Sequence, residues 1–383
     1  MLRDIAWAIC KKIESKFGYN RATEFICSVL TFITCGPKLW RLNNESDRLI
    51  VVTAWMPAYI DNISEVLRQL KLEGQNVAIF PEWQRKKEET YNDEMKKYRN
   101  YNIYYDAHRA LPLINSKLFL SSTATKHFYF SNSGKRFFYF HSVAGLRGFP
   151  EGGMDDYTDF LCATTQQLEE LKARFEVRGF RKTLHEVGYP KFDVICNRLA
   201  EAKQLAADRQ KSKVTVLVAP SYASDDVYAD VSMLPNIELL ISNLLSLGYQ
   251  VIFRPHPVSL RRGGFIQKIQ SIRNSYVKAQ GFIFDESQDY FQTYCKSDIM
   301  VTDVSGTSMM FKAAFKKPVI FFTPDPRGAE EAFNSINQIG PVTDQIQTLP
   351  KLLKEVEFSN TYETPKIFNS GRSIEAFVKI LKG

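Results

Sequence analysis

The sequence lacks the patterns that identify several common classes of protein. Its six cysteines are scattered along the chain: Cys10, Cys27, Cys35, Cys162, Cys196 and Cys295. None forms a C-x-x-C pair, and no Cys/His group has the spacing of zinc ligands, so we expect buried, reduced thiols and no metal site. The phosphate-binding motifs GxxxxGK[ST] and GxGxxG are absent. There are also no repeats and no low-complexity tract.

Long hydrophobic runs are missing as well. The most apolar early stretch, "FICSVLTFITC" (25–35), is shorter than the ~20 residues that span a bilayer, and the start lacks the plan of a secretory signal. Residues 4–17 predict an amphipathic helix whose lysines lie away from its apolar face: Ile5, Ala8, Ile9 and Ile13 against Lys11, Lys12 and Lys16. Such a helix can lie on an anionic membrane, but packing of the apolar face on the domain is the commoner arrangement and the one we favour. We expect a cytoplasmic protein, with any membrane contact peripheral and at the cytoplasmic face of the inner membrane.

Positive charge is in surplus. Lys and Arg number 50 against 42 Asp and Glu, a formal net charge of +8. This balance suits anionic partners such as nucleotides, phosphates, nucleic acids or anionic lipid. The chain has no RNP, KH, zinc-finger or basic-helix signature. Its aromatic residues lie in strand-like runs such as "RFFYF" (136–140), where core packing is the ordinary explanation. We therefore expect no nucleic-acid partner.

The order of predicted elements indicates two α/β domains, which 383 residues can accommodate. After two helices in 1–35, strand–helix–strand spacing over 48–83 is typical of a parallel sheet. Further strand-like runs follow: 117–122, 127–131, 135–142 and 157–164. A second alternating series has strands at 214–220, 250–257, 282–286, 298–303 and 318–323.

We predict four parts from this pattern. They are an N-terminal domain over 1–197 with a helical segment at 1–36, a linker helix at 198–213, a second domain over 214–350, and a C-terminal segment at 351–383 whose helix returns toward the first domain. The fold class is α/β, with two doubly wound Rossmann-like domains facing across a cleft. Ligands of such sheets bind at the carboxyl ends of strands, so the loops after 142, 220, 254 and 303 are the informative ones.

The segment "DVSGTS" (303–308) joins a buried strand to a helix. Asp303 ends the strand, and small residues begin the helix: Ser305, Gly306, Thr307 and Ser308. Backbone N–H groups and hydroxyls at a helix N-terminus bind phosphate. Helix capping is the alternative, since Ser and Thr favour N-caps, but a cap needs only one such residue. We therefore expect a phosphate site here.

The segment "IFRPHPVSLRRGG" (252–264) places Arg254 and His256 just after another strand. Pro255 and Pro257 restrict the backbone on both sides of the imidazole, so His256 is aimed rather than mobile. It could donate hydrogen bonds to a phosphate or act as a general acid, and Arg254 could contact phosphate with two nitrogens. The alternative is a turn in which His256 only caps a carbonyl.

His141 and the loop 219–230 are two further candidates for catalytic residues. His141 ends the aromatic strand "RFFYFHS", where an active-site loop of the first domain would lie, although a strand-end histidine is more often structural. The loop "APSYASDDVYAD" (219–230) holds Asp225 and Asp226, which could serve as base, nucleophile or metal ligand. An acidic surface loop explains them equally well, since Asp and Ser are ordinary turn residues.

These segments, in this order, resemble the CDP-glycerol glycerophosphotransferase-like superfamily over roughly residues 135–325. The matching stretches are "HSVAGLRG", "EVGYPKFD", "VLVAPSY", "GYQVIFRPHP" and "SDIMVTDVSGTSMMFKAAFKKPVIFF". The resemblance implies a GT-B fold and an enzyme that builds teichoic-acid or capsule-type polymers. It implies that His141 is a candidate base for the acceptor hydroxyl, that His256 contacts the donor phosphates and that 305–308 is the donor phosphate loop. It also implies that 1–197 is the acceptor-side domain and 214–350 the nucleotide-donor-binding domain.

The chain also departs from the family pattern. The usual Trp-His-Gly-Thr-Pro is Phe-His-Ser-Val-Ala at 140–144, the arginine often found after "APT" is Ala223, and the second serine of the usual Asp-Tyr-Ser-Ser is Gly306. We expect a metal-independent transferase that moves glycerol phosphate or a sugar from a nucleotide-activated, cytidine-type donor to a hydroxyl of an envelope glycan or lipid-linked acceptor. One alternative is a retaining Kdo transferase that uses CMP-Kdo in lipopolysaccharide synthesis, with Asp225 or Asp226 as nucleophile. Another is a non-catalytic nucleotide- or glycan-binding module.

Overall fold

The computed structural model describes residues 2–83, 89–124, 129–146, 149–205, 213–222, 230–260, 264–287, 289–332, 336–358 and 361–383. The chain divides into two compact units. Unit 1 comprises Met1–His141, Phe149–Asp193 and Ile367–Gly383, and unit 2 comprises Ser142–Gly148 and Val194–Lys366. Helix α8 (Pro190–Leu205) therefore contributes residues to both units, and it includes the first part of the linker predicted at 198–213.

Unit 1 is built on a parallel sheet with the strand order β3-β2-β1-β4-β5-β6-β7. Its strands are β1 (Leu49–Ala54), β2 (Asn76–Pro81), β3 (Asn102–Ile103), β4 (Leu118–Ser121), β5 (Arg136–Tyr139), β6 (Asp159–Cys162) and β7 (Thr183–Glu186). Every described residue of the central β1 and β4 is buried, as expected for a parallel sheet covered on both faces. Apolar runs such as "LIVVTA" and "LFLS" can therefore be read from the sequence as strands.

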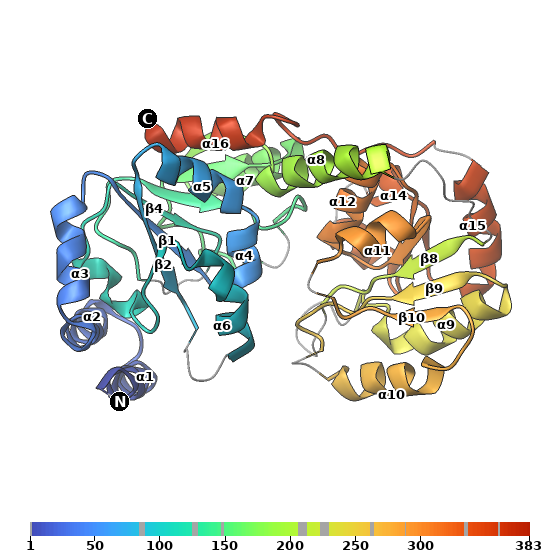
Figure 1. Cartoon of the computed structure of the whole chain (residues 1–383), viewed down its shortest axis with the longest axis horizontal. Helices are drawn as coiled ribbons and strands as arrows, with labels where there is room; N and C mark the ends of the chain where they lie inside the picture. Colours follow the sequence, from blue (N-terminus) through green and yellow to red (C-terminus); the bar gives the residue numbers. More distant parts are fainter. Residues whose placement is uncertain are drawn as a thin grey trace. The chain divides into compact units, whose positions relative to one another are not determined.

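The helices of unit 1 cover its sheet (Figure 1). They are α1 (Leu2–Phe17), α2 (Arg21–Cys35), α3 (Pro37–Leu42), α4 (Pro57–Asp61), α5 (Ser64–Leu72), α6 (Glu89–Met95), α7 (Thr165–Val177) and the C-terminal α16 (Ser373–Lys382). Helix α16 packs against α5 and starts on Asp193, whose carboxylate accepts the N–H groups of Gly371 and Ser373 at 2.8 and 2.6 Å. The end of the chain thus belongs to unit 1.

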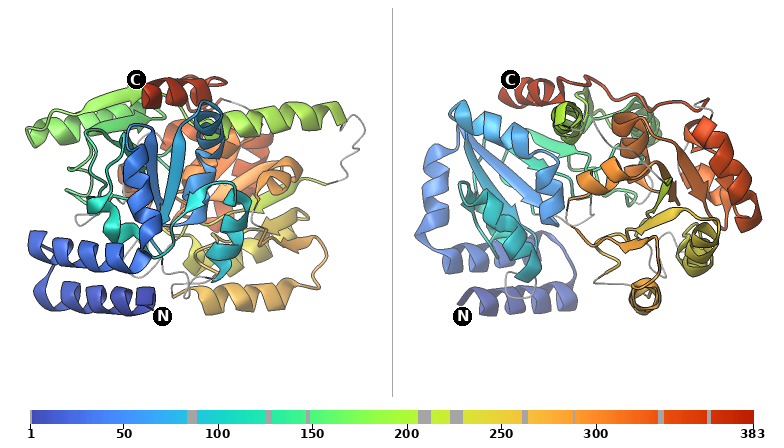
Figure 2. Two further views of the ribbon diagram at one scale, coloured as in Figure 1. Left: turned by 60° about the vertical axis from the view of Figure 1, so that its left-hand side comes forward. Right: turned by 45° about the vertical axis from the view of Figure 1, so that its right-hand side comes forward.

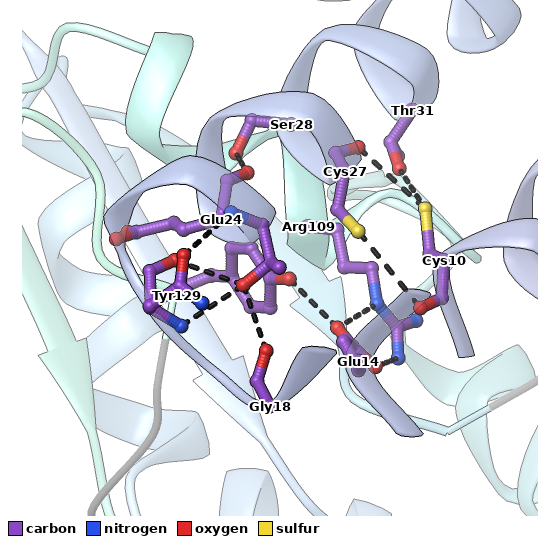
Figure 3. A network of polar contacts seen from close by, with 11 residues as sticks. Cys10, Glu14, Gly18, Glu24, Cys27, Ser28, Thr31, Arg109 and Tyr129 are labelled. Atoms are coloured by element: carbon purple, nitrogen blue, oxygen red, sulfur yellow. Dashed lines mark hydrogen bonds and ion pairs between the residues drawn. The ribbon is translucent and has the colours of Figure 1, made fainter. Parts of the chain in front are cut away.

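Two expectations for unit 1 differ from the structure. Residues 129–131, within the predicted strand 127–131, are not in a strand. Tyr129 and Phe130 instead pack their rings on other elements, and the ring centroids of Phe130 and Phe119 are 5.1 Å apart. The stripe of α1 that we expected to pack on the domain is turned outward, since Ile5 and Ile9 are 48% and 42% exposed. Helix α1 packs instead through Ala6 and Cys10, because α2 contacts that side through Cys27 (Figure 2 and Figure 3).

A buried polar network fastens α1 to two segments further along unit 1 (Figure 3). Arg109, 5% exposed, donates through Nε and Nη2 to both carboxylate oxygens of Glu14 at 2.9 Å. Tyr129 donates its hydroxyl to Glu14 at 2.7 Å.

Among the described residues no single helix is long and apolar enough to cross a membrane. Only the pair Arg21–Cys35 and Lys38–Glu45, bent by 101°, meets the length and composition test jointly.

Unit 2 repeats the architecture with the strand order β10-β9-β8-β11-β12-β13 and parallel pairing throughout. The strands are β8 (Thr215–Val218), β9 (Gln250–Phe253), β10 (Phe282–Phe284), β11 (Ile299–Thr302), β12 (Val319–Phe322) and β13 (Val342–Thr343). The helices are α9 (Ile237–Ser246), α10 (Ile266–Tyr276), α11 (Phe291–Lys296), α12 (Gly306–Phe315), α13 (Pro326–Ala332), α14 (Ile336–Ile339) and α15 (Leu349–Phe358).

An apolar core joins this second sheet to helices α9, α10 and α15. It joins Val216 and Val218 of β8 to Leu240 and Leu244 of α9 and to Leu353 of α15, all fully buried. Strand order reverses between β8 and β11, since β9 and β10 lie on one side and β12 and β13 on the other. The carboxyl ends of β8 and β11 therefore form the position where doubly wound sheets bind ligands.

Candidate active site

The loops that follow β8, β9 and β11 come together at the carboxyl edge of the sheet of unit 2. The N–H of Ala219 donates to the carbonyl of Val301 at 3.0 Å, and that of Arg254 donates to the carbonyl of Val218 at 2.9 Å. Asp303, fully buried, accepts the N–H groups of Ser221 and Met233 at 2.7 and 3.0 Å. Burial raises the pKa of Asp303 despite these donors. Its carboxylate therefore organises the loop after β8 rather than pointing to solvent.

Helix α12 begins directly after this aspartate. Ser305 is its N-cap, with its hydroxyl accepting the N–H of Thr307 at 3.4 Å and lying 2.9 Å from the Thr307 hydroxyl. Ser308 is fully buried, and its hydroxyl donates to the Ser305 carbonyl at 2.6 Å. Capping by Ser305 is thus present. Gly306 and Thr307 remain part-exposed at the positive end of the helix dipole, which favours an anion.

Gly306 lies close to Ser142 within unit 2. A Cβ added to Gly306 would lie 2.1 Å from the hydroxyl oxygen of Ser142 and 3.5 Å from the Cβ of Ala144. The same Ser142 hydroxyl accepts the N–H of Ala144 at 3.2 Å. The backbone of Gly306 is not in the left-handed region, so a side chain there is opposed by the Ser142 contact and not by the backbone conformation. Ser142 and Gly306 are two of the departures from the family pattern noted above, and they meet in space.

We expect Gly306→Ala to destabilise the protein, although Gly→Ala in a helix usually stabilises by about 0.5–1 kcal/mol. The added methyl would displace the Ser142 hydroxyl, an overpacking cost of about 1–3 kcal/mol. The double variant Gly306→Ala/Ser142→Gly should regain the usual stability. Urea unfolding of both variants and of Ser142→Gly measures the coupling.

Gly134→Ala is the matched control for this cycle, since a Cβ there meets nothing within 4 Å. It should leave the free energy of unfolding nearly unchanged. Additive effects of Gly306→Ala and Ser142→Gly would show that the contact is unimportant for stability.

His256 is held in one tautomer, and its surroundings favour the neutral form. Its Nδ1 accepts the N–H of Val258 at 3.2 Å. Burial, followed by the nearby charge of Arg254, lowers the pKa of His256 to about 4. The imidazole is therefore neutral at physiological pH, with its proton on Nε2, and it can donate one hydrogen bond. Tyr222 lies beside it, with ring centroids 6.0 Å apart.

Arg254 is engaged by neighbouring protein groups. Its Nη1 donates to Asp285 Oδ2 at 2.6 Å and to the Ser287 hydroxyl at 3.0 Å, and its Nη2 donates to the Ser287 carbonyl at 2.7 Å. Burial works to raise the pKa of Asp285, but the hydrogen bonds from Ser287 and Thr293 and the charge of Arg254 hold it below the ordinary value. Arg254 thus fastens the loop after β9 to the loop after β10. Contact of Arg254 with a phosphate stays a prediction.

His141 lies in unit 1, at the carboxyl end of β5. Its ring stacks on Tyr59 at a centroid distance of 4.1 Å and an angle of 13°, and the edge of Phe149 lies 5.7 Å away. Its carbonyl accepts hydrogen bonds from Asn62 Nδ2 and the Tyr189 hydroxyl, both at 3.0 Å. The histidine is therefore held firmly at the edge of the sheet where ligands of this fold bind.

Sequence reasoning missed Glu82, which follows β2 at the same edge of the sheet. Thr123 donates its hydroxyl to Glu82 Oε1 at 2.8 Å, and burial raises the pKa of Glu82 to about 8. The signal was present in "IFPEW", a carboxyl group directly after a buried strand.

Asp225, Asp226, Arg261 and Arg262 lie outside the described residues. Within the described ranges, no group of three or more His, Cys, Asp or Glu side chains is arranged to hold a metal ion.

The family model for CDP-glycerol:poly(glycerophosphate) glycerophosphotransferases matches residues 38–369. The chain belongs to this family. Membership supports a transferase that uses a nucleotide-activated donor, and the predicted resemblance is confirmed. The family does not support the Kdo and lipopolysaccharide alternative. No curated protein of similar sequence matches the chain.

Solved structures confirm the GT-B-like fold. The wall teichoic acid polymerase TagF is similar with a TM-score of 0.59 at 13% identity, covering 99% of this chain and 97% of TagF. The UDP-GlcNAc 2-epimerase of Neisseria meningitidis is similar with a TM-score of 0.59 at 14% identity, covering 88% and 100%. That of Methanocaldococcus jannaschii has a TM-score of 0.58 at 14% identity, covering 87% and 99%. At such identities the likeness concerns the fold alone.

Proposed function

We propose that this transferase moves glycerol phosphate from a cytidine-nucleotide donor to a hydroxyl of a cell-envelope polysaccharide or a lipid-linked acceptor. The observation that carries the proposal is that two groups suited to bind an anion follow the two strands that flank β8, at one edge of the sheet of unit 2. They are the neutral, aimed His256 after β9 and the N-terminus of α12 after β11. The family match supports this choice of donor class.

In the proposed reaction the donor phosphates bind at the N-terminus of α12. The hydroxyls of Ser305 and Thr307 and the Nε2–H of His256 donate hydrogen bonds to the leaving phosphate, where negative charge increases. The helix dipole acts in the same direction. No metal is invoked in this scheme, because these donors would stabilise the negative charge of the departing nucleotide. Arg254 holds the turn that carries His256, as its contacts to Asp285 and Ser287 indicate.

The acceptor hydroxyl is activated by His141. The oxygen of the acceptor hydroxyl forms a bond to the phosphorus of the transferred glycerol phosphate, while the bond from that phosphorus to the CMP oxygen breaks. CMP leaves with the electron pair, and the hydroxyl proton moves to the His141 imidazole. Stacking on Tyr59 and Phe149 would keep that imidazole oriented through the step.

Thermal unfolding with a panel of nucleotides tests the donor class. We expect CDP-glycerol and CMP or CDP to raise the melting temperature, since a ligand at 100 times its Kd stabilises by about 2.7 kcal/mol. The panel also includes CDP-ribitol, CMP-Kdo, UDP-sugars and the bare nucleotides. Release of CMP from CDP-glycerol in the presence of acceptor measures turnover.

Three outcomes of this panel would count against the proposal. A response only to UDP compounds would overturn the cytidine donor. Stabilisation by CMP-Kdo with release of CMP would favour the Kdo transferase. Binding without turnover across the panel would favour a nucleotide-binding module.

A further inference from the structure

Residues 142–146 come shortly after β5 in the chain, yet they lie in unit 2. Two apolar residues of this segment, Val143 and Leu146, are buried. The Ser142 hydroxyl accepts the N–H of Ala144 at 3.2 Å, which closes a tight turn. Burial of the neighbouring residues and this hydrogen bond together fix the position of Ser142.

The Ser142 hydroxyl lies at the N-terminus of α12. A Cβ built on Gly306, the first residue of that helix, would be 2.1 Å from Ser142 Oγ. In an α-helix the Cα–Cβ bond tilts toward the N-terminus, which is the end where the first backbone N–H groups have no partner within the helix. Ser142 Oγ therefore adjoins the positive end of the α12 dipole, where the donor phosphates of the proposed reaction bind.

Helix α12 provides only part of the hydroxyl groups at this end. The Ser308 hydroxyl is buried and donates to the Ser305 carbonyl at 2.6 Å, and Gly306 has no side chain. The hydroxyls of Ser305 and Thr307 remain, 2.9 Å apart. Ser142 adds a third hydroxyl from another segment of the chain, in the place that a side chain at position 306 would occupy.

The turn makes the Ser142 hydroxyl a good hydrogen-bond donor. A serine hydroxyl has one proton, which rotates to suit its acceptor. Because the Ala144 N–H donates to the oxygen, the O–H bond is polarised and donates more strongly. A hydrogen bond to an ionised acceptor is about twice as strong as one between neutral groups. Ser142 is therefore suited to an anionic ligand.

The chain order indicates which phosphate Ser142 contacts. In the proposed reaction His141 takes the proton of the hydroxyl that attacks the transferred phosphorus. Ser142 is the next residue, and consecutive Cα atoms are about 3.8 Å apart. A hydroxyl this close in the chain to the base suits the transferred phosphate better than the phosphate of the departing CMP.

We propose that Ser142 is a further donor-binding residue, whose hydroxyl donates a hydrogen bond to an oxygen of the phosphate that is transferred. The inference rests on the proposed function, because it assigns a contact within the same site. It also defines the ligand class that uses this contact. Nucleoside diphosphates and their esters, such as CDP and CDP-glycerol, have the second phosphate that Ser142 binds, and CMP lacks it.

Calorimetric titration with CDP and with CMP tests the contact. Ser142→Ala should weaken CDP binding at least tenfold, the effect of losing one hydrogen bond to a charged group. It should change the affinity for CMP less than twofold. With CDP-glycerol as donor, kcat/KM should fall at least as much as the affinity for CDP.

Moving the hydroxyl across the contact separates binding from packing. Ser142→Gly/Gly306→Ser removes the hydroxyl from the turn and supplies one from the helix, on a Cβ that lies 2.1 Å from the original oxygen. This variant should recover most of the CDP affinity that Ser142→Gly loses. Ser142→Gly/Gly306→Ala fills the same space without a hydroxyl, so it should recover stability but not CDP affinity.

Ser133→Ala is the control for the loss of a serine turn. Ser133 lies in unit 1, ahead of β5, and its hydroxyl accepts the N–H of Lys135 at 3.3 Å, as that of Ser142 does for Ala144. This variant should bind CDP and CMP like the wild type.

Three results would overturn this inference and leave the proposed function in place. They are unchanged CDP affinity in Ser142→Ala, equal losses of affinity for CDP and CMP, and full recovery of CDP binding by the Ser142→Gly/Gly306→Ala variant. A wild-type protein that binds neither CDP nor CDP-glycerol would overturn the proposed function and this inference together.

Discussion

His256→Ala should lower the rate of group transfer by about 10²–10³-fold, the usual effect of removing one donor from a site that stabilises developing charge. The imidazole is neutral, and its Nε2–H is the hydrogen-bond donor that alanine removes. The side chain is not part of the apolar core of unit 2, so folding should be retained. Release of CMP, with kcat and KM determined separately, and thermal unfolding of the same samples measure the two effects.

His256→Gln is the matched control, because glutamine keeps a neutral N–H donor in a similar position. It should retain more activity than alanine. The pH dependence gives a second readout. Because the folded pKa, about 4, lies below the unfolded value of 6.5, the unfolded chain binds a proton that the folded chain does not.

Wild-type stability should therefore fall as the pH drops from 6.5 toward 4, and His256→Gln should lack this part of the loss. Full turnover by His256→Ala would refute the role of this residue. A kinetic pKa near 6.5 that disappears in His256→Gln would show that the imidazole titrates and is not a fixed neutral donor.

Arg254→Ala should lower the free energy of unfolding by about 3–5 kcal/mol, the typical cost of removing one partner from a buried ion pair. The variant leaves Asp285 charged and part-buried, with Ser287 and Thr293 as its remaining donors. It also releases the turn that carries His256, so donor affinity should fall with stability. Urea unfolding and the CDP-induced thermal shift measure these effects.

An exposed ion pair in the same unit serves as the control. Arg273 contacts Glu286 at 3.1 Å, with side chains 41% and 51% exposed. Arg273→Ala should cost less than about 1 kcal/mol, because water screens such pairs. Equal losses in the two variants would show that burial of the Arg254–Asp285 pair is unimportant. An unchanged CDP-induced thermal shift in Arg254→Ala would show that the turn carrying His256 does not contribute to donor binding.

Much of the fold follows from local sequence. Runs such as "LIVVTA" and "VIFF" are buried along their whole length because each strand is covered on both faces, and an uninterrupted apolar run is what such a strand requires. The start of α12 at Gly306 also follows from its cap, since Ser305 after a strand is a local signal. The prolines around His256 predicted a rigid turn for the same local reason.

Other features depend on partners distant in the chain. "HFYFS" has the composition of a strand, yet Tyr129 of that run serves the Arg109–Glu14 network. Arg254 looks available for phosphate in the sequence, but its nearest acceptors are 31 and 33 residues further on. Helix α2 is apolar enough to be placed in the core, and no local signal shows that its polar side is the buried one.

The sequence by itself determined the α/β alternation, the strand ends that carry His141, Asp303 and the 254–256 turn, and the family. These are consequences of periodicity, caps and backbone restriction, which act over a few residues. Only the tertiary structure decided that Gly306 faces Ser142, that His256 is neutral, and that the N-terminal helices turn their apolar sides outward. Contact, desolvation and exposure are properties of groups brought together by folding, so they depend on residues far apart in the chain.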